Sequence, residues 1–407
     1  MVFGVSLAFS KDSVSKARWL LRRLLFSVVD ALIPKNGRYW VFPVYFIGEG
    51  SFSDNMLAVF MEVRHDPEIK KIILTRNKAV NLSGSNVLIL PMNSYAAALY
   101  MLRARVWLVQ HSVWLDFSCA KFQLYSGAGR YIINLWHGVP VKSLAHENTG
   151  IHTKRGIREM PNYRIITSSY KDKKNMQSAF MYTPDDNFWV TGIPRNDFMH
   201  CEESALPDTF RTQLLSLDKA LTGRKLMLYA PTYRETEVGG GYYDFSIDDV
   251  RKIEEFCRSY NFVFGVRHHI YRKPECFQRL FESAHVLDLS ADVIDDVRLL
   301  MRRVGLLVTD YSSVVVDAIY NGVPFAAFSY DLESYKFVQR GFFYEYKDIF
   351  KERIFKDFDG VLGWAISESI AASSADVMLA AELGLFDFVD SCNSKRVVLE
   401  IQKLAYQ

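Results

Sequence analysis

Short runs of β-branched and aromatic residues alternate with longer helix-favouring segments, and the alternation occurs twice along this chain of 407 residues. A parallel strand pair needs a crossover connection, so strands that alternate with helices predict a parallel sheet covered by helices on both faces. A polar stretch, residues 200–225, separates the two series. The runs of the first series are RYWVFPVYF, KKIILT, NVLILP, RVWLVQ, RYIINLW, YRIITSS and NFWVTG, and those of the second are KLMLYAP, NFVFGVRH, HVLDLS, GLLVTD and PFAAFSY.

The two series predict an α/β fold of two Rossmann-like, doubly wound domains that face each other across a cleft. The length agrees, because single hydrophobic cores stop growing at about 250–300 residues. The expected boundaries are 36–210 for the first domain and 211–375 for the second, and a helical segment, 376–407, would cross back to the first domain. A ligand should bind between the domains, where carboxyl ends of strands face one another.

Residues 1–35 combine basic and apolar side chains at helical spacing. The longest charge-free piece beside the basic cluster, Leu24 to Val29, is far shorter than the roughly 20 residues of a membrane span. We therefore predict an amphipathic helix that either lies on an anionic membrane surface or packs on the first domain. Its apolar face would contain Leu20, Leu21, Leu24, Leu25, Val28 and Leu32, with Lys16, Arg18, Arg22 and Arg23 off that face.

Charge and cysteine content give no support to a nucleic-acid-binding or a disulfide-stapled protein. The formal net charge of +3 gives no argument for a nucleic-acid partner. The five cysteines are scattered and contain no CxxC pair. This pattern fits reduced thiols in a cytosolic compartment better than disulfides or a zinc site.

The stretch INLWHGVPVKSLA, residues 132–144, places an ionisable side chain at the mouth of a predicted strand. His137 and Gly138 occupy the turn after YIINLW, so the imidazole would point toward the cleft. Gly138 permits close approach by a ligand, and Lys142 is near enough to meet an anion. A lone histidine after a strand is more often structural, so this motif needs support from others.

The stretch GLLVTDYSSVVVDAIYNGVPFAAF, residues 305–328, predicts a strand, a tight turn, a helix and a strand. Ser312 and Ser313 stand where an N-cap belongs. A helix N-terminus with free N–H groups and two hydroxyls would seat a phosphate or pyrophosphate, and the alternative is an ordinary capped helix. Asp317, one turn further on, would accept a hydrogen bond from a ribose diol or face solvent.

Arginines follow three other predicted strands. Arg195 stands in VTGIPRNDF, Arg234 in LYAPTYRE and Arg267 in FGVRHHIYRK. At strand ends facing the cleft, they would neutralise a diphosphate without a bound cation. The pair His268 and His269 has no carboxylate or third histidine at ligand spacing, so we predict no metal site.

Five motifs occur in one order: WHGVPVKSL, TGIPRND, LYAPTYRE, RHH and VTDYSSVVVDAIYNGVPFAAFSYDLESYKFVQRGFF. In these motifs the chain resembles the CDP-glycerol glycerophosphotransferases, which comprise teichoic-acid primases and polymerases and related capsule enzymes. The resemblance covers roughly residues 37–350 and includes EGSFSDN, residues 49–55. It implies a GT-B arrangement of the two domains. It also implies transfer of a polyol phosphate from CDP-glycerol or CDP-ribitol to a hydroxyl, without a metal or other cofactor.

The resemblance also assigns roles by position. His137 matches the histidine of the family's Trp-His-Gly motif, and His269 that of its Arg-x-His motif. His268 replaces a residue that is usually apolar there, so either of the two adjacent imidazoles could be the functional one. His137 would take the proton of the acceptor hydroxyl, while His269 would help to hold the diphosphate and the departing CMP. The expected donor-binding residues are Gly138, Arg195, Arg234, Arg267, Ser312, Ser313 and Asp317.

The expected partners follow from this chemistry. The acceptor would be a lipid-linked molecule or a polysaccharide, at the inner face of the cell membrane, where a peripheral cytoplasmic protein meets an anionic surface. The motifs do not separate a glycerol from a ribitol donor, or a primase from a polymerase. Two other functions stay open: a GT-B glycosyltransferase that uses a nucleotide sugar, and a nucleotide-binding scaffold without turnover.

Overall fold

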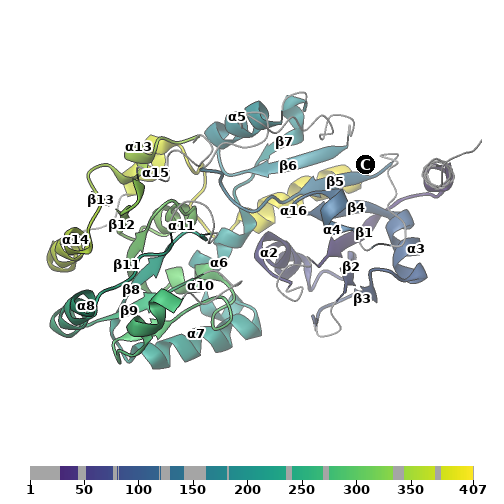
Figure 1. Ribbon diagram of the computed structural model, residues 1–407. Coiled ribbons are helices and arrows are strands. Elements are labelled where there is room, and N and C mark those ends of the chain that lie inside the picture. The colour runs from purple at the N-terminus through teal and green to yellow at the C-terminus, as the bar shows by residue number, and fades with distance from the viewer. Residues whose placement is uncertain are drawn as a thin grey trace, which may run out of the picture.

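The computed structural model shows two halves, each built on one parallel sheet (Figure 1). His269 and most of the predicted amphipathic helix lie outside the described residues. The structure describes residues 28–44, 52–76, 80, 82–118, 120, 129–141, 162–180, 183–234, 241–268, 275–332, 343–371 and 377–406.

The N-terminal half contains a seven-stranded sheet. Its strands are β1 (Asn36–Pro43), β2 (Lys70–Thr75), β3 (Val87–Pro91), β4 (Ala104–Val109), β5 (Tyr131–Asn134), β6 (Tyr163–Thr167) and β7 (Phe188–Val190). They lie in the order β3-β2-β1-β4-β5-β6-β7, which reverses between β1 and β4. Helices cover both faces of the sheet. On one face Phe42 of β1 shares an apolar cluster with Phe60 of α2, and on the other face Val41 of β1 shares one with Met101 of α3. The helical elements of this half are α2 (Asp54–Val63), α3 (Tyr95–Arg103), α4 (Val113–Asp116), α5 (Tyr170–Ala179) and η4 (Asp185–Asn187).

The C-terminal half repeats this plan with six strands. They are β8 (Lys225–Ala230), β9 (Phe262–Val266), β10 (Val286–Asp288), β11 (Val304–Thr309), β12 (Phe325–Phe328) and β13 (Ile354–Phe355). The order β10-β9-β8-β11-β12-β13 reverses between β8 and β11. Both halves therefore have the strand order of a Rossmann fold, as the sequence predicts. The helical elements are α8 (Ile247–Tyr260), η7 (Glu275–Phe277), α9 (Gln278–Phe281), α10 (Val297–Met301), α11 (Val314–Tyr320), α13 (Tyr346–Phe350) and α14 (Phe358–Ala371).

The two halves share apolar packing where the chain passes from one to the other. This connection consists of η5 (Pro194–Asn196), α6 (Asp197–His200), η6 (Glu203–Ala205) and α7 (Asp208–Leu221). The rings of Phe198 and Phe210 pack edge to face at 5.2 Å between centroids. Arg302, after α10, donates to the carbonyls of Phe198 and Cys201 at 2.8 and 2.9 Å. These contacts fix the C-terminal half against the connection.

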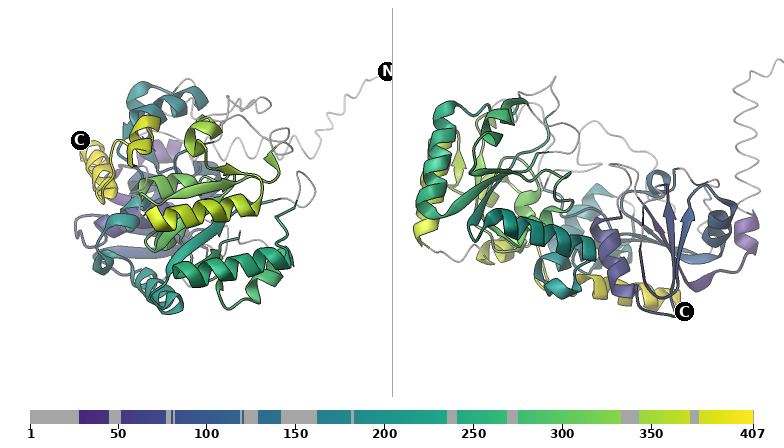
Figure 2. Two further views of the ribbon diagram at one scale, coloured as in Figure 1. Left: turned by 90° about the vertical axis from the view of Figure 1, so that its left-hand side faces the viewer. Right: turned by 90° about the horizontal axis from the view of Figure 1, so that it is seen from below.

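In the C-terminal segment, α15 (Val377–Leu383) contacts α11 and α13 of the C-terminal half, and α16 (Asn393–Ala405) returns to the N-terminal half. Figure 2 shows the yellow α16 beside the blue strands of that half, and it packs on α2 and β1. The Asp197 carboxylate accepts from the backbone N–H groups of Asn393 (2.9 Å) and Ser394 (2.8 Å), so it caps α16. Asn393 also donates to the Tyr320 hydroxyl at the end of α11 (3.0 Å), which links α16 to both halves.

The described end of the predicted amphipathic helix contacts the N-terminal half. Asp30 is fully buried and accepts two hydrogen bonds from Arg130, at 2.7 and 2.9 Å, and one from Lys35, at 2.7 Å. Val28 and Leu32, in contrast, are 51% and 78% exposed. Across the residues that can be described, we find no helix with the length and apolar character needed to cross a bilayer.

Candidate functional site

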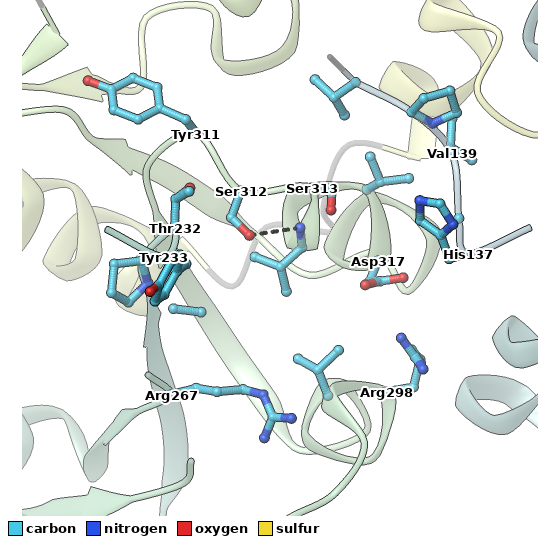
Figure 3. A pocket seen from close by; sticks show the side chains of 18 of the residues that line it. His137, Val139, Thr232, Tyr233, Arg267, Arg298, Tyr311, Ser312, Ser313 and Asp317 are labelled. Carbon is cyan, nitrogen blue, oxygen red and sulfur yellow. Dashed lines mark hydrogen bonds between the residues drawn. The ribbon is translucent and has the colours of Figure 1, made fainter. Parts of the chain in front are cut away.

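A cavity of about 460 Å³ lies between the two halves. This volume is within the range of small-molecule sites, about 300–1,000 Å³. Figure 3 shows α11 in the middle of its wall, with His137 at one side and Arg267 and Tyr233 at the other. The lining residues are Trp136, His137, Gly138, Val139, Pro140, Val141 and Arg195 from the N-terminal half, and Ala230, Pro231, Thr232, Tyr233, Arg267, His268, Val297, Arg298, Tyr311, Ser312, Ser313, Val314, Val316 and Asp317 from the C-terminal half.

His137 stands in a strained turn directly after β5. Trp136 before it has a φ of +50° and Gly138 after it a φ of +128°, backbone angles that residues other than glycine seldom adopt. Asn55 of α2 holds the turn, because its side-chain amide donates to the carbonyls of Leu135 (2.8 Å) and Trp136 (2.9 Å). Such strain persists only where neighbours over-determine it, and it concentrates at functional sites.

The environment of His137 favours a neutral imidazole. Burial, together with the charges of His111 and Arg195, lowers the pKa of His137 from 6.5 to about 4. The Asp54 carboxylate and a hydrogen bond with the backbone of Gln110 act in the opposite direction but are outweighed. At neutral pH His137 is therefore unprotonated and able to accept a proton.

Two ion pairs cross from one half to the other at the cavity. Arg195, after β7, lies 3.3 Å from Asp54 of its own half and 3.7 Å from Asp317 of α11. Arg298 of α10 lies 3.5 Å from Asp54 and 2.6 Å from Asp296. Burial works to raise the pKa of Asp54, but Arg195 and Arg298 outweigh it and lower the pKa. Asp54 and Arg298 are site residues that the motif analysis did not select, although Asp54 belongs to the Ser-Asp-Asn of EGSFSDN.

Gly138 and Asp317 lie against these charges. The space that a Cβ on Gly138 would fill holds the guanidinium of Arg195. Glycine was predicted to let a ligand approach closely, and in this structure the Arg195 side chain takes that place. The Asp317 side chain is only 8% exposed, which excludes the alternative that it faces solvent. Burial raises the pKa of Asp317 in spite of Arg195 and Arg298.

The Tyr311–Ser313 turn brings the N-terminus of α11 to the cavity, as expected. The Ser312 hydroxyl accepts from the backbone N–H of Val314 at 3.4 Å, which Figure 3 marks with a dashed line. Ser313 occupies the N-cap position, but its side chain makes no capping hydrogen bond. Of the two predicted caps, only Ser312 therefore bonds to the helix backbone through its side chain.

Arg267 and His268 line the opposite wall. Arg267 donates to the carbonyls of Leu289 (2.9 Å) and Ile294 (2.8 Å), which fixes its guanidinium at the edge of the cavity. Burial lowers the pKa of Arg267 to about 10, so the group is still cationic at neutral pH. The His268 Nε2 atom lies 3.6 Å from the Asp288 carboxylate. Because His269 is outside the described residues, the choice between these two histidines stays open.

Arg234 does not extend into the cleft, and this prediction is wrong. Its side chain is 4% exposed and forms ion pairs with Asp310 (2.7 Å) and Asp331. Burial by itself would lower the pKa of Arg234, but the two carboxylates reverse this and raise it. Asp310 also accepts from the backbone N–H of Thr232 (2.7 Å) and that of Tyr311 (2.6 Å), so the network lies behind two residues of the cavity wall. Arg234 therefore acts through Asp310, which holds Thr232 and Tyr311 of the cavity wall in place.

The sequence matches the family of CDP-glycerol:poly(glycerophosphate) glycerophosphotransferases over residues 34–403. The chain belongs to this family. Its members are transferases, and the alternative of a nucleotide-sugar glycosyltransferase loses its support.

Individual relatives agree with the family assignment. The chain is 28% identical to the teichoic acid poly(glycerol phosphate) polymerase of Bacillus subtilis (strain 168) over 305 residues, which are 70% of this chain and 37% of that protein. It is 27% identical to the polymerase of the same name from Bacillus spizizenii (strain W23) over 353 residues, 82% of this chain and 84% of that one. The match to the first relative thus spans little more than a third of its length.

A solved structure of the wall teichoic acid polymerase TagF, a variant soaked with CDPG, superimposes with a TM-score of 0.73 at 19% identity. The superposition covers 98% of this chain and 99% of the other. It confirms the GT-B arrangement of two Rossmann-like domains. In the part of the chain that the structure describes, no three His, Cys, Asp or Glu residues are grouped as ligands for a metal ion.

Proposed function

We propose that this glycerophosphotransferase-family protein transfers a polyol phosphate from a CDP-activated donor to a hydroxyl of a teichoic-acid or capsule acceptor, and releases CMP. One observation carries the proposal: the neutral imidazole of His137 opens into the same cavity as the Tyr311–Ser313 turn and Arg267 of the other half. A general base from one domain thereby faces groups of the other that suit an anion.

In the proposed reaction the acceptor oxygen attacks the β-phosphorus of the donor. A new O–P bond forms, and the bond between that phosphorus and the bridging oxygen of CMP breaks. His137 takes the proton of the attacking hydroxyl, a contribution of about 100- to 10,000-fold in rate. The hydrogen bond with Gln110 and the strained turn fix the imidazole before the substrate arrives.

The negative charge that develops on CMP needs a positive environment. Arg267 supplies a fixed guanidinium, and the Ser312 and Ser313 hydroxyls, which line the same cavity, supply donors. We assign donor binding to this wall of the cavity, and no cofactor to the reaction. His268 or His269 would complete the wall.

A turnover assay tests the proposal against the other two functions, a glycosyltransferase and a scaffold without turnover. We expect the purified protein, given a candidate acceptor, to release CMP from CDP-glycerol or CDP-ribitol, and mass spectrometry of the product to give the increment of one or more polyol phosphates. UDP- and GDP-sugars serve as control donors. Consumption of a sugar nucleotide alone would refute the proposal, and binding without turnover on any acceptor would favour the scaffold.

We also propose that residues 1–35 bring the protein to an anionic membrane surface as a peripheral protein at the cytoplasmic face, where a lipid-linked acceptor resides. The exposed side chains of Val28 and Leu32 continue the apolar face predicted from the sequence. We expect the double variant Leu21→Glu/Leu25→Glu to lose sedimentation with anionic liposomes. Leu215→Glu, at a side chain 61% exposed on α7, should sediment like the parent. Equal sedimentation of all three proteins would show that the helix packs on its own domain.

A further inference from the structure

His111 lies next to His137 although 26 positions separate them in the sequence. It follows β4, whose neighbour in the sheet is β5, so the two strand ends bring the imidazoles together. Their rings stack with 5.4 Å between centroids and 15° between planes. The His137 ring also stacks on that of Trp136, at 4.5 Å and 27°. Two ring neighbours thus restrict rotation of the His137 imidazole about its side-chain bond, a torsion that is otherwise broad.

Asp116 fixes His111 in turn. One Asp116 oxygen, Oδ2, accepts from the backbone N–H groups of Gln110 (2.8 Å) and His111 (3.0 Å). The other, Oδ1, lies 3.2 Å from Nδ1 of His111. Asp116 is 4% exposed, while the His111 side chain is 27% exposed. A buried carboxylate on Nδ1 orients the ring, as in other carboxylate–histidine pairs.

The charges that face His137 come from several elements. His111 after β4 and Arg195 in η5 disfavour a proton on it, and Asp54 at the start of α2 favours one. Arg298 of α10 and Asp317 of α11 line the same cavity from the other half. Arg195 is engaged by two carboxylates. His111 differs from the other groups named here because it also stacks its ring on that of His137.

We propose that His111 is a positioning residue for His137: the ring stack fixes the plane of the His137 imidazole, and Asp116 holds the ring of His111 in place. The inference rests on the proposed role of His137 as the general base. It adds to the family motifs a pair, His111 and Asp116, that lies behind His137 and is not among the residues that line the cavity.

The test compares His111→Ala with His111→Phe in the full chain. Phenylalanine keeps the ring stack and the burial but cannot carry a charge. We expect His111→Ala to lower kcat by about 10-fold while the donor KM stays within about twofold, because orientation and not binding is lost. His111→Phe should keep kcat within about threefold of the parent. His65→Ala, at an exposed turn, is the control.

The second readout does not need turnover. The protein is labelled with 15N-histidine, and the His137 resonance is assigned by its loss in His137→Gln. We expect the His137 imidazole to titrate at a higher pH in both His111 variants than in the parent. The midpoint should rise because His111 is one of the groups that lower the pKa of His137 in the parent. An unchanged midpoint in both variants, or equal losses of kcat in His111→Ala and His111→Phe, would overturn the proposal. If the parent protein turns over no CDP-polyol, the proposed function fails while this titration still decides the coupling.

Discussion

Replacement of His137 by alanine is expected to lower the rate of polyol phosphate transfer by about 100- to 10,000-fold, the contribution of a positioned general base. Donor binding should change little, because the groups assigned to the diphosphate, Arg267 and the Ser312–Ser313 turn, lie in the other half of the protein. Single-turnover kinetics would measure the rate, and calorimetry with CDP-glycerol the affinity. His200→Ala, at a histidine outside the cavity lining, should behave like the parent.

The pH dependence of transfer provides a second test of the same assignment. The pKa of His137 is lowered, so the imidazole is in its active, neutral form above about pH 4 and is lost as a base only when the pH falls through that value. The acidic limb of kcat/KM should therefore lie well below pH 6.5 in the parent. A limb at or above pH 6.5, or full transfer by His137→Ala, would contradict the assignment of His137 as the base.

The strands could be predicted because each is a short apolar run bounded by polar or turn residues. KKIILT coincides with β2, Lys70–Thr75, and PFAAFSY contains β12, Phe325–Phe328. Strand β13 was not predicted, because its two residues, Ile354 and Phe355, are too few for a pattern. It forms by pairing with the already placed β12, which is a tertiary effect.

The site could be predicted only as far as strand ends determine it. The carboxyl ends of parallel strands meet at one edge, so a residue after a strand, such as His137 or Arg267, is placed near the cavity by topology alone. Which side chain pairs with which is not determined in this way. Arg234 meets partners 76 and 97 residues away, and Arg298 meets Asp54 of α2 from the other half. The stack of His111 on His137 depends in the same way on two strands becoming neighbours.

Replacement of Arg234 by methionine is expected to lower the free energy of unfolding by about 3–5 kcal/mol, the cost of removing one partner from a buried ionic network. Methionine keeps the apolar part of the side chain but leaves the Asp310 and Asp331 carboxylates together without their cation. Urea unfolding followed by tryptophan fluorescence would measure the loss. If Arg234 instead bound the donor directly, the variant would lose affinity for CDP-glycerol and keep its stability.

Arg303→Met provides the matched control, because Arg303 also pairs with two carboxylates, Asp218 and Glu203, at 2.6 and 2.8 Å. The side chains of those partners are 40% and 51% exposed, so water solvates the carboxylates when the guanidinium is removed. We therefore expect the free energy of unfolding to fall by only about 0–1 kcal/mol. Adding Asp331→Asn to Arg234→Met should recover part of the lost stability, since it removes one of two neighbouring negative charges. Equal destabilisation by Arg234→Met and Arg303→Met would show that burial of the network does not determine its contribution, and would return Arg234 to the candidates for donor binding.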